Sequence, residues 1–195
     1  PRAVGRILDA RRGLVLVVGP FGAGKSTTLA SLANEFNHQR GSRIVTIERP
    51  IEYVLPSDKS IIEQREVGRD TPSFARGLRS LLEEDVDVVV VSHLPDAETV
   101  DLAQLVVESG RLVLAGANAD SIVKAIQRLV TAFSYSQQET ARARLAEALN
   151  LIVVQRLLPR IGGGRVVAAG VLVMTPPIRS IIREGELLQL NNILA

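Results

Sequence analysis

The residues best suited to chemistry form a glycine-rich loop near the start of the chain. Residues 19–27 read Gly-Pro-Phe-Gly-Ala-Gly-Lys-Ser-Thr and complete the pattern G-x-x-x-x-G-K-[ST]. Small residues let such a loop curl so that backbone N–H groups point inward around a phosphate, and a helix that opens at Lys25 adds its positive dipole end. Lys25 is expected to reach the β- and γ-phosphates, and the Ser26 hydroxyl is expected to be a ligand of Mg²⁺.

The motif therefore predicts a nucleotide site, with ATP and Mg²⁺ as its ligands. A glycine-rich turn that arose by chance is the alternative, but the apolar run at residues 14–18 supplies the strand that the motif requires. A lysine is also unusual here, because the chain has three lysines and twenty arginines. The predicted nucleotide-binding residues are Gly19, Pro20, Phe21, Gly22, Ala23, Gly24, Lys25, Ser26 and Thr27.

Composition narrows the class of protein further. The chain has 195 residues, 46% of them hydrophobic and 23% charged, which is enough to bury the core of one globular domain. It contains no run of about 18 apolar residues, so no membrane-spanning helix is expected. The absence of cysteine excludes disulfides and thiolate metal sites and suits a cytoplasmic protein. Scattered arginines, a net charge of +2 and 3% aromatic residues argue against a nucleic-acid partner.

The order of the apolar segments predicts an α/β fold. Helices are expected between strands, with start signals at Thr71 before Pro72, at Asp96, and at Ser136 with Glu139. Nearly continuous Val, Leu and Ile runs are typical of parallel strands buried on both faces, so we expect a doubly wound, mostly parallel sheet with the loop at a strand's carboxyl end. The further predicted strands are residues 43–48, 61–67, 86–91, 112–115 and 151–154.

The C-terminal part departs from this alternation. The three glycines at residues 162–164 separate two apolar segments and predict an antiparallel hairpin at one edge of the sheet. Pro176 and Pro177 then open a short terminal helix that is expected to end near Glu184. Because the first residue is Pro1 rather than Met, residues 1–195 are expected to be a single domain, the C-terminal one, of a longer protein.

Several stretches beyond the loop resemble the ATPase domain of the type IV pilus retraction motors, within the type II and type IV secretion ATPases. The resemblance runs from Arg12 to about Asn192 with little need for gaps. It is carried by an acidic "Asp box", an arginine-bearing segment, the helix before the Walker B strand, the C-terminal hairpin and a C-terminal helix. In this order, these are residues 46–52 (TIERPIE), 64–71 (QREVGRDT), 78–85 (LRSLLEED), 161–167 and 177–184 (PIRSIIRE).

This resemblance implies a RecA-like P-loop NTPase domain that couples ATP hydrolysis to the movement of pilin. Members of the family are hexameric rings, so it also implies a homo-oligomer that works with platform proteins of a pilus or secretion system at the inner membrane. The protein is then expected in the cytoplasm, and it reaches the membrane through these partners without inserting into it. Part of the active site is expected from a neighbouring subunit or from an N-terminal domain.

The chain departs from the family pattern where the chemistry takes place. The Walker B strand of the family ends in Gly-Glu, and this chain has Ser92 and His93 at those positions. Its Asp box has Arg49 in place of an Asp, although Glu48 is retained. Hydrolysis is therefore expected to be weakened. The other replaced positions, which are two histidines and an arginine in the family, are Arg111, Asn118 and Pro95.

Three residues are predicted to act in catalysis. Glu48 follows a strand at its carboxyl end and is expected to position or deprotonate the attacking water, with a solvated loop carboxylate as the alternative. Arg65 and Arg69 are expected to neutralise charge on the γ-phosphate, directly or across a subunit boundary. Their alternative is an arginine-rich surface, which is also what we expect for Arg49 and Arg111.

His93 is interpreted as a strand-end residue rather than as a base. Phosphate oxygens nearby would favour imidazolium and raise the pKa of His93. A protonated histidine cannot accept a proton from water. His38 is expected on a solvated helix surface.

Two functions fit the sequence. The first is a nucleotide-binding motor subunit of a pilus or secretion system with weakened hydrolysis, and the second is a regulatory or structural ring member that binds ATP without turnover. A small-molecule kinase would need an acceptor pocket and a mobile lid that carries an arginine, and no segment has that pattern. A RecA-like nucleic-acid motor is disfavoured by the dispersed charge.

Overall fold

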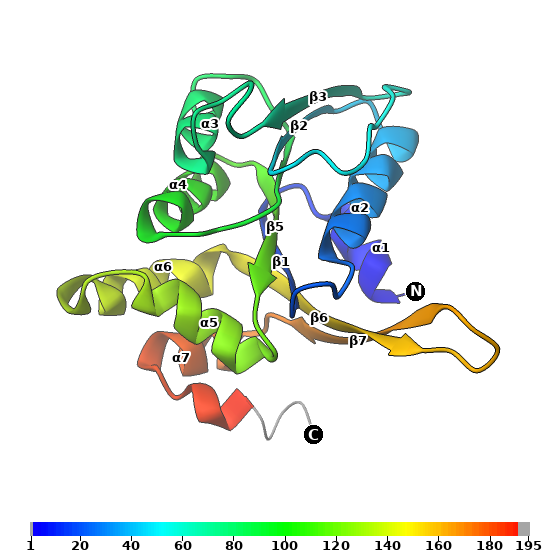
Figure 1. Ribbon diagram of the computed structural model, residues 1–195. Helices are drawn as coiled ribbons and strands as arrows, with labels where there is room; N and C mark the ends of the chain where they lie inside the picture. Colours follow the sequence, from blue (N-terminus) through cyan, green and yellow to red (C-terminus); the bar gives the residue numbers. More distant parts are fainter. Residues whose placement is uncertain (1, 191–195) are drawn as a thin grey trace.

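The chain folds around a seven-stranded sheet, shown in Figure 1 as a computed structural model that describes residues 2–190. Asn192, near the end of the stretch with the family resemblance, lies outside the described residues. The strands are β1 (Gly13–Gly19), β2 (Arg43–Glu48), β3 (Ile61–Glu66), β4 (Val88–Val91), β5 (Leu112–Asn118), β6 (Leu149–Pro159) and β7 (Arg165–Val173). The helices are α1 (Arg2–Asp9), α2 (Lys25–Gln39), α3 (Phe74–Leu81), α4 (Ala97–Glu108), α5 (Ile122–Thr131), α6 (Gln138–Ala148) and α7 (Pro176–Glu184), with short 3-10 turns at Tyr135–Gln137 and Leu187–Gln189.

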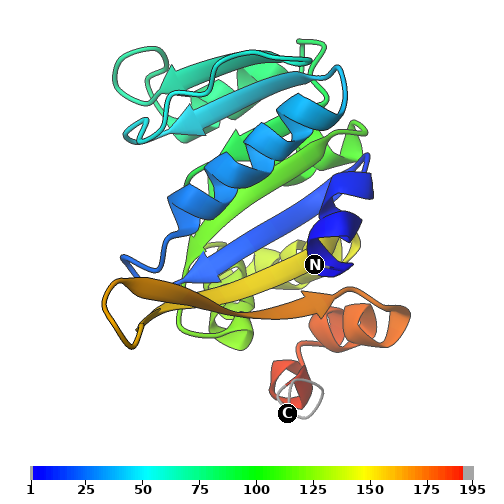
Figure 2. The same ribbon diagram turned by 90° about the vertical axis from the view of Figure 1, so that its right-hand side faces the viewer.

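The strands lie in the order β3-β2-β4-β5-β1-β6-β7. Every neighbouring pair is parallel except β6 and β7, which pair antiparallel. Helices α1 and α2 cover one face of the sheet, and α3 to α7 lie over the other (Figures 1 and 2). The predicted α/β fold, a doubly wound and mostly parallel sheet with a C-terminal hairpin and terminal helices, is confirmed.

Strand β1 is buried over its whole length. Successive side chains of a strand point to opposite faces, so Leu14, Leu16 and Val18 enter the core under α3 to α7. Val15 and Val17 enter the core under α1 and α2. Backbone pairing with β5 on one edge and β6 on the other completes the enclosure. The loop that follows β1 therefore starts from a strand that is held on all four sides.

The five further predicted strands are all present. Strand β5 continues past the predicted end to Asn118, because it pairs with β1 up to that residue. Strand β6 runs from Leu149 to Pro159, well beyond its apolar run. Its outer half has a partner only in β7, with which it pairs as far as Pro159 and Arg165. Hairpin pairing, rather than burial, thus sets the length of β6.

Two predicted helix starts are wrong. Helix α3 begins after Ser73, whose side chain accepts a hydrogen bond from Arg76 N, whereas the Thr71 hydroxyl is engaged with the backbone carbonyl of Ser73. Ser136 lies inside a 3-10 turn before α6 and forms no capping box with Glu139. The other start is confirmed: the Asp96 side chain accepts from Thr99 N at 2.8 Å and caps α4.

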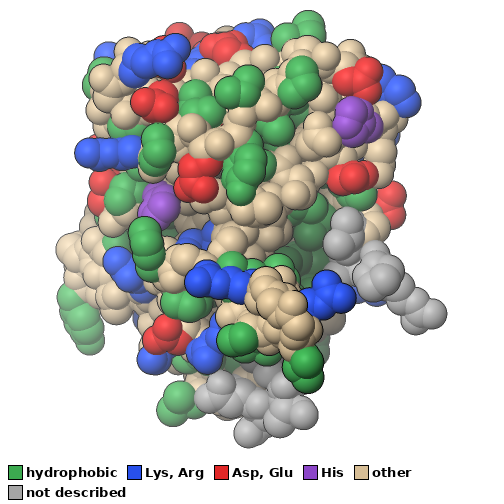
Figure 3. All heavy atoms as spheres, turned by 45° about the vertical axis from the view of Figure 1, so that its right-hand side comes forward, with side chains coloured by type: hydrophobic (Ala, Val, Ile, Leu, Met, Phe, Trp, Pro, Cys, Tyr) green, Lys and Arg blue, Asp and Glu red, His purple; other side chains and the backbone are tan. Residues whose placement is uncertain are grey.

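The β6–β7 hairpin extends past the body of the sheet (Figure 1). Ile161, at its turn, is fully exposed, and Val166 and Val167 are each half exposed. Figure 3 shows apolar and basic side chains side by side over this part of the surface. The basic residues of the hairpin are Arg156, Arg160 and Arg165.

A close backbone approach in the centre of the sheet gives a first prediction. A Cβ added to Gly116 of β5 would lie 2.3 Å from the backbone oxygen of Ser92, so Gly116→Ala requires the ends of β4 and β5 to move apart. We expect the free energy of unfolding, measured with urea, to fall by about 2 to 3 kcal/mol. Gly5→Ala is the control, because a Cβ on Gly5 of α1 meets no atom within 4 Å and should stabilise by about 0.5 to 1 kcal/mol. Equal stability of Gly116→Ala and the wild type would contradict this account.

Candidate nucleotide-binding site

The glycine-rich loop connects the buried end of β1 to the first turn of α2. A Cβ on Gly19 would lie 2.7 Å from both the Ala23 Cβ and the Gln155 backbone oxygen, so only glycine allows the loop to fold back this tightly. Gly24 has φ 82° and forms the N-cap of α2 in the left-handed region, which glycine adopts without steric cost. The loop geometry that the motif predicted is therefore built by these residues.

Lys25 spans the loop. Its ammonium donates to the backbone oxygens of Gly19 at 3.0 Å and Pro20 at 2.9 Å, and the residue is 8% exposed. Burial lowers the pKa of Lys25 below its ordinary value of 10.5, and the nearby Glu52 carboxylate works in the opposite direction. The structure thus places a desolvated ammonium at the predicted phosphate position.

The segment after β2, residues 49–60, folds over the start of α2. Ser26 Oγ donates to Glu52 Oε1 at 2.9 Å, and the Thr27 and Tyr53 hydroxyls lie 2.8 Å apart. Hydroxyl and carboxylate oxygens are the donors that Mg²⁺ prefers, so the residues here fit the predicted metal. Glu52 was not among the predicted site residues, and its only sequence signal was its place at the end of the acidic box.

A cavity beside the loop brings together three elements. It is lined by Ser26 of α2, by Glu48 and Arg49 at the end of β2, and by Ser92 and His93 after β4. Parallel strands present their carboxyl ends on one edge of a sheet, which explains this convergence. Arg49, which was expected on an arginine-rich surface, lines this cavity.

Glu48 is held in a fixed orientation within this cavity. Its Oε1 accepts hydrogen bonds from Thr46 Oγ1 at 2.6 Å and from Gln64 Nε2 at 3.0 Å. Thr46 is buried in β2, and Gln64 lies opposite it on β3. The structure therefore brings the predicted catalytic carboxylate to the loop, while its action on water stays a prediction.

His93 contacts a second position at which the chain departs from the family. Its Nε2 lies 3.2 Å from Asn118 Nδ2 at the end of β5, and its ring lies 6.4 Å from the Phe74 ring. Burial, followed by the charges of Lys25 and Arg128, lowers the pKa of His93, and Glu52 alone opposes them. Phosphate oxygens, from which the sequence predicted a raised pKa, would act in the opposite direction. The protein's own groups favour the neutral imidazole.

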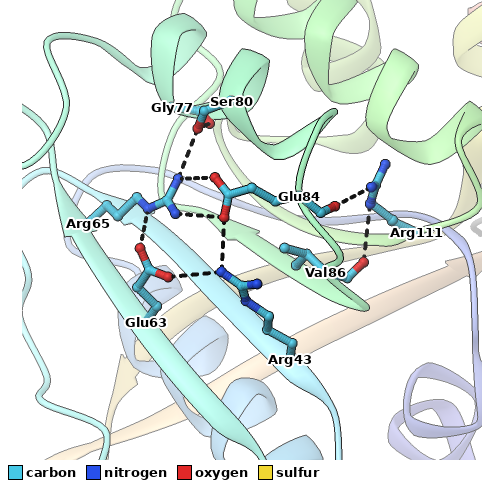
Figure 4. Close-up of polar contacts among 8 residues, drawn as sticks. All are labelled: Arg43, Glu63, Arg65, Gly77, Ser80, Glu84, Val86 and Arg111. Atoms are coloured by element: carbon cyan, nitrogen blue, oxygen red, sulfur yellow. Dashed lines mark hydrogen bonds and ion pairs between the residues drawn. The ribbon is translucent and has the colours of Figure 1, made fainter.

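The structure places Arg65 in an ion-pair network on β3 (Figure 4). Its guanidinium donates to Glu84 through two nitrogens, at 2.9 and 3.0 Å, to Glu63 at 2.6 Å and to the Ser80 hydroxyl at 2.9 Å. The hydrogen bonds that Arg65 donates to Glu84 and Glu63 raise its pKa against the effect of burial. Arg43 adds a second cation to Glu84 at 3.1 Å. The predicted role of Arg65 at the γ-phosphate therefore requires it to leave these partners.

Arg69 and Arg111 differ in their surroundings. The Arg69 side chain is 75% exposed in the turn after β3, with Nε at 3.4 Å from Asp70. Arg111 instead donates to the backbone oxygens of Glu84 and Val86 and so ties the start of β5 to the segment before β4 (Figure 4). Of the two predicted catalytic arginines, Arg69 is the one whose side chain faces solvent.

The sheet and the loop together form the fold of the P-loop NTPases. The family model described as Type II/IV secretion system protein matches residues 2–184. The chain belongs to this family, and it is homologous to pilus retraction and secretion ATPases.

Individual relatives agree with this assignment. The type IV pilus retraction ATPase PilT of Pseudomonas aeruginosa is 44% identical over 185 residues, which cover 95% of this chain and 54% of that protein. A twitching motility protein of Neisseria gonorrhoeae is 41% identical over 195 residues, covering 100% of this chain and 52% of the relative. The crystal structure of the pilus retraction motor PilT with bound ADP matches with a TM-score of 0.93 and 45% identity, over 99% of this chain and 56% of that one. The predicted family is confirmed, and the chain spans about half the length of these relatives.

The Arg65 network gives a prediction about pH. Hydrogen bonds from Arg65 hold the pKa of Glu84 below its ordinary value of 4.5. A carboxyl group with a lowered pKa stabilises the fold above its unfolded pKa, and this contribution is lost as the pH falls through the folded pKa. We expect Glu84→Gln to reduce the free energy of unfolding at pH 7 by about 2 kcal/mol, with the difference from wild type shrinking below about pH 4.5.

Chemical denaturation between pH 3 and pH 7 measures this difference. Glu98→Gln is the matched control, because its pair with Arg79 is more than half exposed and should change stability little at any pH. A Glu84→Gln difference that stays constant with pH would show that the Arg65–Glu84 pair is not the source.

Proposed function

We propose that this chain binds ATP with Mg²⁺ and serves as the nucleotide-driven domain of a pilus or secretion motor. The observation that supports this most directly is the loop itself, where Lys25 lies 8% exposed across the turn that precedes α2. Ser26 would hold Mg²⁺, which would neutralise phosphate charge. Lys25 would exchange its backbone partners for phosphate oxygens, and the loop N–H groups would bind the remainder.

Hydrolysis is proposed to be slow. Glu48 is the carboxylate that we assign to orient or deprotonate water, and His93 stands where the family has a Walker B glutamate. Arg49 and His93 also make this end of the site more positive than an Asp and a Glu would. Ground-state phosphates are already anionic, so added positive charge tightens ATP and ADP binding without favouring the transition state equally. Tight binding and slow turnover are therefore expected together.

The assembly is proposed to be a homo-oligomeric ring, hexameric as in the resembling motors, that acts on pilus or secretion platform proteins at the inner membrane from the cytoplasmic side. No helix within residues 2–190 combines the length and the apolar character needed to span a bilayer. The exposed Arg69 suits a role at a neighbour's γ-phosphate. Arg65 would need its carboxylate partners to be replaced before it could do the same.

A ring member that binds ATP without turnover is the second candidate. The replacement of the Walker B glutamate by His93 favours it, because this position is the usual source of a base or water-orienting group in the family. The fixed orientation of Glu48 favours residual hydrolysis instead. Turnover measured beside nucleotide affinity separates the two.

The first functional prediction concerns binding. Lys25→Ala should abolish binding of ATP and ADP in calorimetry with Mg²⁺, because Lys25 is the lysine of the loop sequence. Lys59→Ala is the matched control, since Lys59 is exposed in the segment after β2 and should leave the affinity unchanged. The same affinity for Lys25→Ala and the wild type would refute the proposed function.

The second functional prediction concerns the rate of ATP hydrolysis. A missing base or water-orienting group typically costs about 10² to 10⁴ in rate, so we expect phosphate release well below about 1 s⁻¹. His93→Glu combined with Arg49→Asp should raise turnover, whereas His93→Gln, which adds no carboxylate, should not. Wild-type turnover of about one per second or more would overturn the claim of slow hydrolysis.

A further inference from the structure

A buried glutamine on β6 links the sheet to the glycine-rich loop. Gln155 is 2% exposed and follows Val154, the last residue of β6 that pairs with β1. Its Nε2 donates to the Ala23 backbone oxygen at 2.7 Å, and its Oε1 accepts from Thr28 Oγ1 at 2.9 Å. One side chain thus holds both the loop and the first turn of α2, from a residue more than a hundred positions later in the chain.

The chemistry of these partners fixes the orientation of the amide. A backbone carbonyl can only accept a hydrogen bond, so the nitrogen must face Ala23 and the oxygen must face the Thr28 hydroxyl. Glutamate in place of Gln155 would set a carboxylate oxygen against the Ala23 carbonyl. Leucine would leave that carbonyl buried without a partner.

This contact also sets the direction of an N–H group in the loop. In a planar trans peptide the C=O and N–H bonds point in opposite directions. Because Gln155 holds the Ala23 carbonyl toward β6, the Gly24 N–H points away from β6 and is left free of that strand for a phosphate. Gly24 has φ 82°, and glycine can rotate out of this region at little cost, so the peptide needs an external hold.

A second contact comes from the same residue. A Cβ built on Gly19 would lie 2.7 Å from the Gln155 backbone oxygen, so the start of the loop packs directly on the main chain of β6 at this point. Gln155 therefore contacts the beginning of the loop with its backbone and the end with its side chain.

We propose that Gln155 is a positioning residue of the nucleotide site, which keeps the peptide between Ala23 and Gly24 in its phosphate-binding orientation. This inference rests on the proposed nucleotide binding. If the loop adopts its phosphate-binding conformation only part of the time, its affinity for the ligand falls in proportion to that fraction. A loop that is held in this conformation before the ligand arrives avoids the loss. Gln155 would act on the loop that surrounds the phosphates, so its effect on affinity should be the same for a nucleotide and for inorganic pyrophosphate.

The test compares Gln155→Glu and Gln155→Leu with the wild type in titrations with ADP and with inorganic pyrophosphate, each with Mg²⁺. We expect both variants to lose about 10- to 100-fold in affinity, by a similar factor for the two ligands. Thr28→Val, which keeps the bond to Ala23, should lose about threefold or less. Thermal unfolding without ligand identifies the folded variants, and Gln155→Glu, which keeps the side-chain shape, carries the test if Gln155→Leu does not fold.

Gln104 provides the matched control. It is a glutamine 1% exposed on α4, in the core on the opposite face of the sheet from α2, and its Nε2 has no hydrogen-bond partner among the described residues. Gln104→Leu should alter thermal stability and leave both affinities within about twofold.

The outcomes distinguish a failure of the role of Gln155 from a failure of the proposed nucleotide binding. A wild type that binds, beside folded Gln155 variants of equal affinity, overturns the role of Gln155 alone. A drop in ADP affinity with unchanged pyrophosphate affinity also overturns the role of Gln155, because the phosphate-binding loop would then be intact. A wild type that binds neither ligand overturns the proposed function together with this inference.

Discussion

The enclosure of β1 is the constraint on which the rest of the site depends. Its side chains alternate between the two cores, and its edges are paired with β5 and β6. The loop that follows therefore has one immobile end, and α2, packed on the sheet through buried residues such as Phe36, supplies the other. A loop held at both ends can keep its N–H groups converged in advance, which is what anion binding by backbone requires.

The electrostatics of the site follow from which charges the fold brings to this edge. Burial lowers the pKa values of Lys25 and His93, the charge of Lys25 lowers that of His93 further, and Glu52 opposes both shifts. Glu48 is kept in place by uncharged donors on β2 and β3. The ion pairs of Arg65 with Glu63 and Glu84 join β3 to the segment after α3 and lie away from the loop. The positive charge of Arg65 is therefore paired with carboxylates away from the loop, whereas the positive charge of Lys25 lies within the loop.

Much of the fold and part of the site could be predicted because their signals are local. Continuous runs of Val and Leu identify buried parallel strands, and the loop motif is one short segment. The contacts made by Gln155 and Glu52 could not be predicted, because they join residues 132 and 26 positions apart. Composition showed that Arg65 was one of many arginines, but only the pairing of β2 with β3 and the end of α3 decides that it meets Glu84.

The misplaced helix starts have a similar cause. Thr71 and Ser136 are both suitable caps by type, but Ser73 caps α3, and α6 begins after Gln137 with no side-chain cap. Ser73 caps α3 because Thr71 is held in the turn after β3, where its N–H donates to Glu66 O. A sequence pattern identifies the residues able to cap a helix, while tertiary hydrogen bonds select which of them does.

The two functions of the site rest on different parts of the chain, and this explains how they can separate. Phosphate binding, as proposed, would depend on the loop backbone, on Lys25 and on the contacts that hold them. Hydrolysis, as proposed, would depend on side chains at the ends of β2, β4 and β5, where His93 and Asn118, two positions at which the resemblance implies a departure from the family pattern, lie 3.2 Å apart. Because the two side chains contact each other, both replacements alter the same part of the site. Because the pair is uncharged when His93 is neutral, it compensates none of the positive charge of Lys25, and that charge remains available to an incoming phosphate.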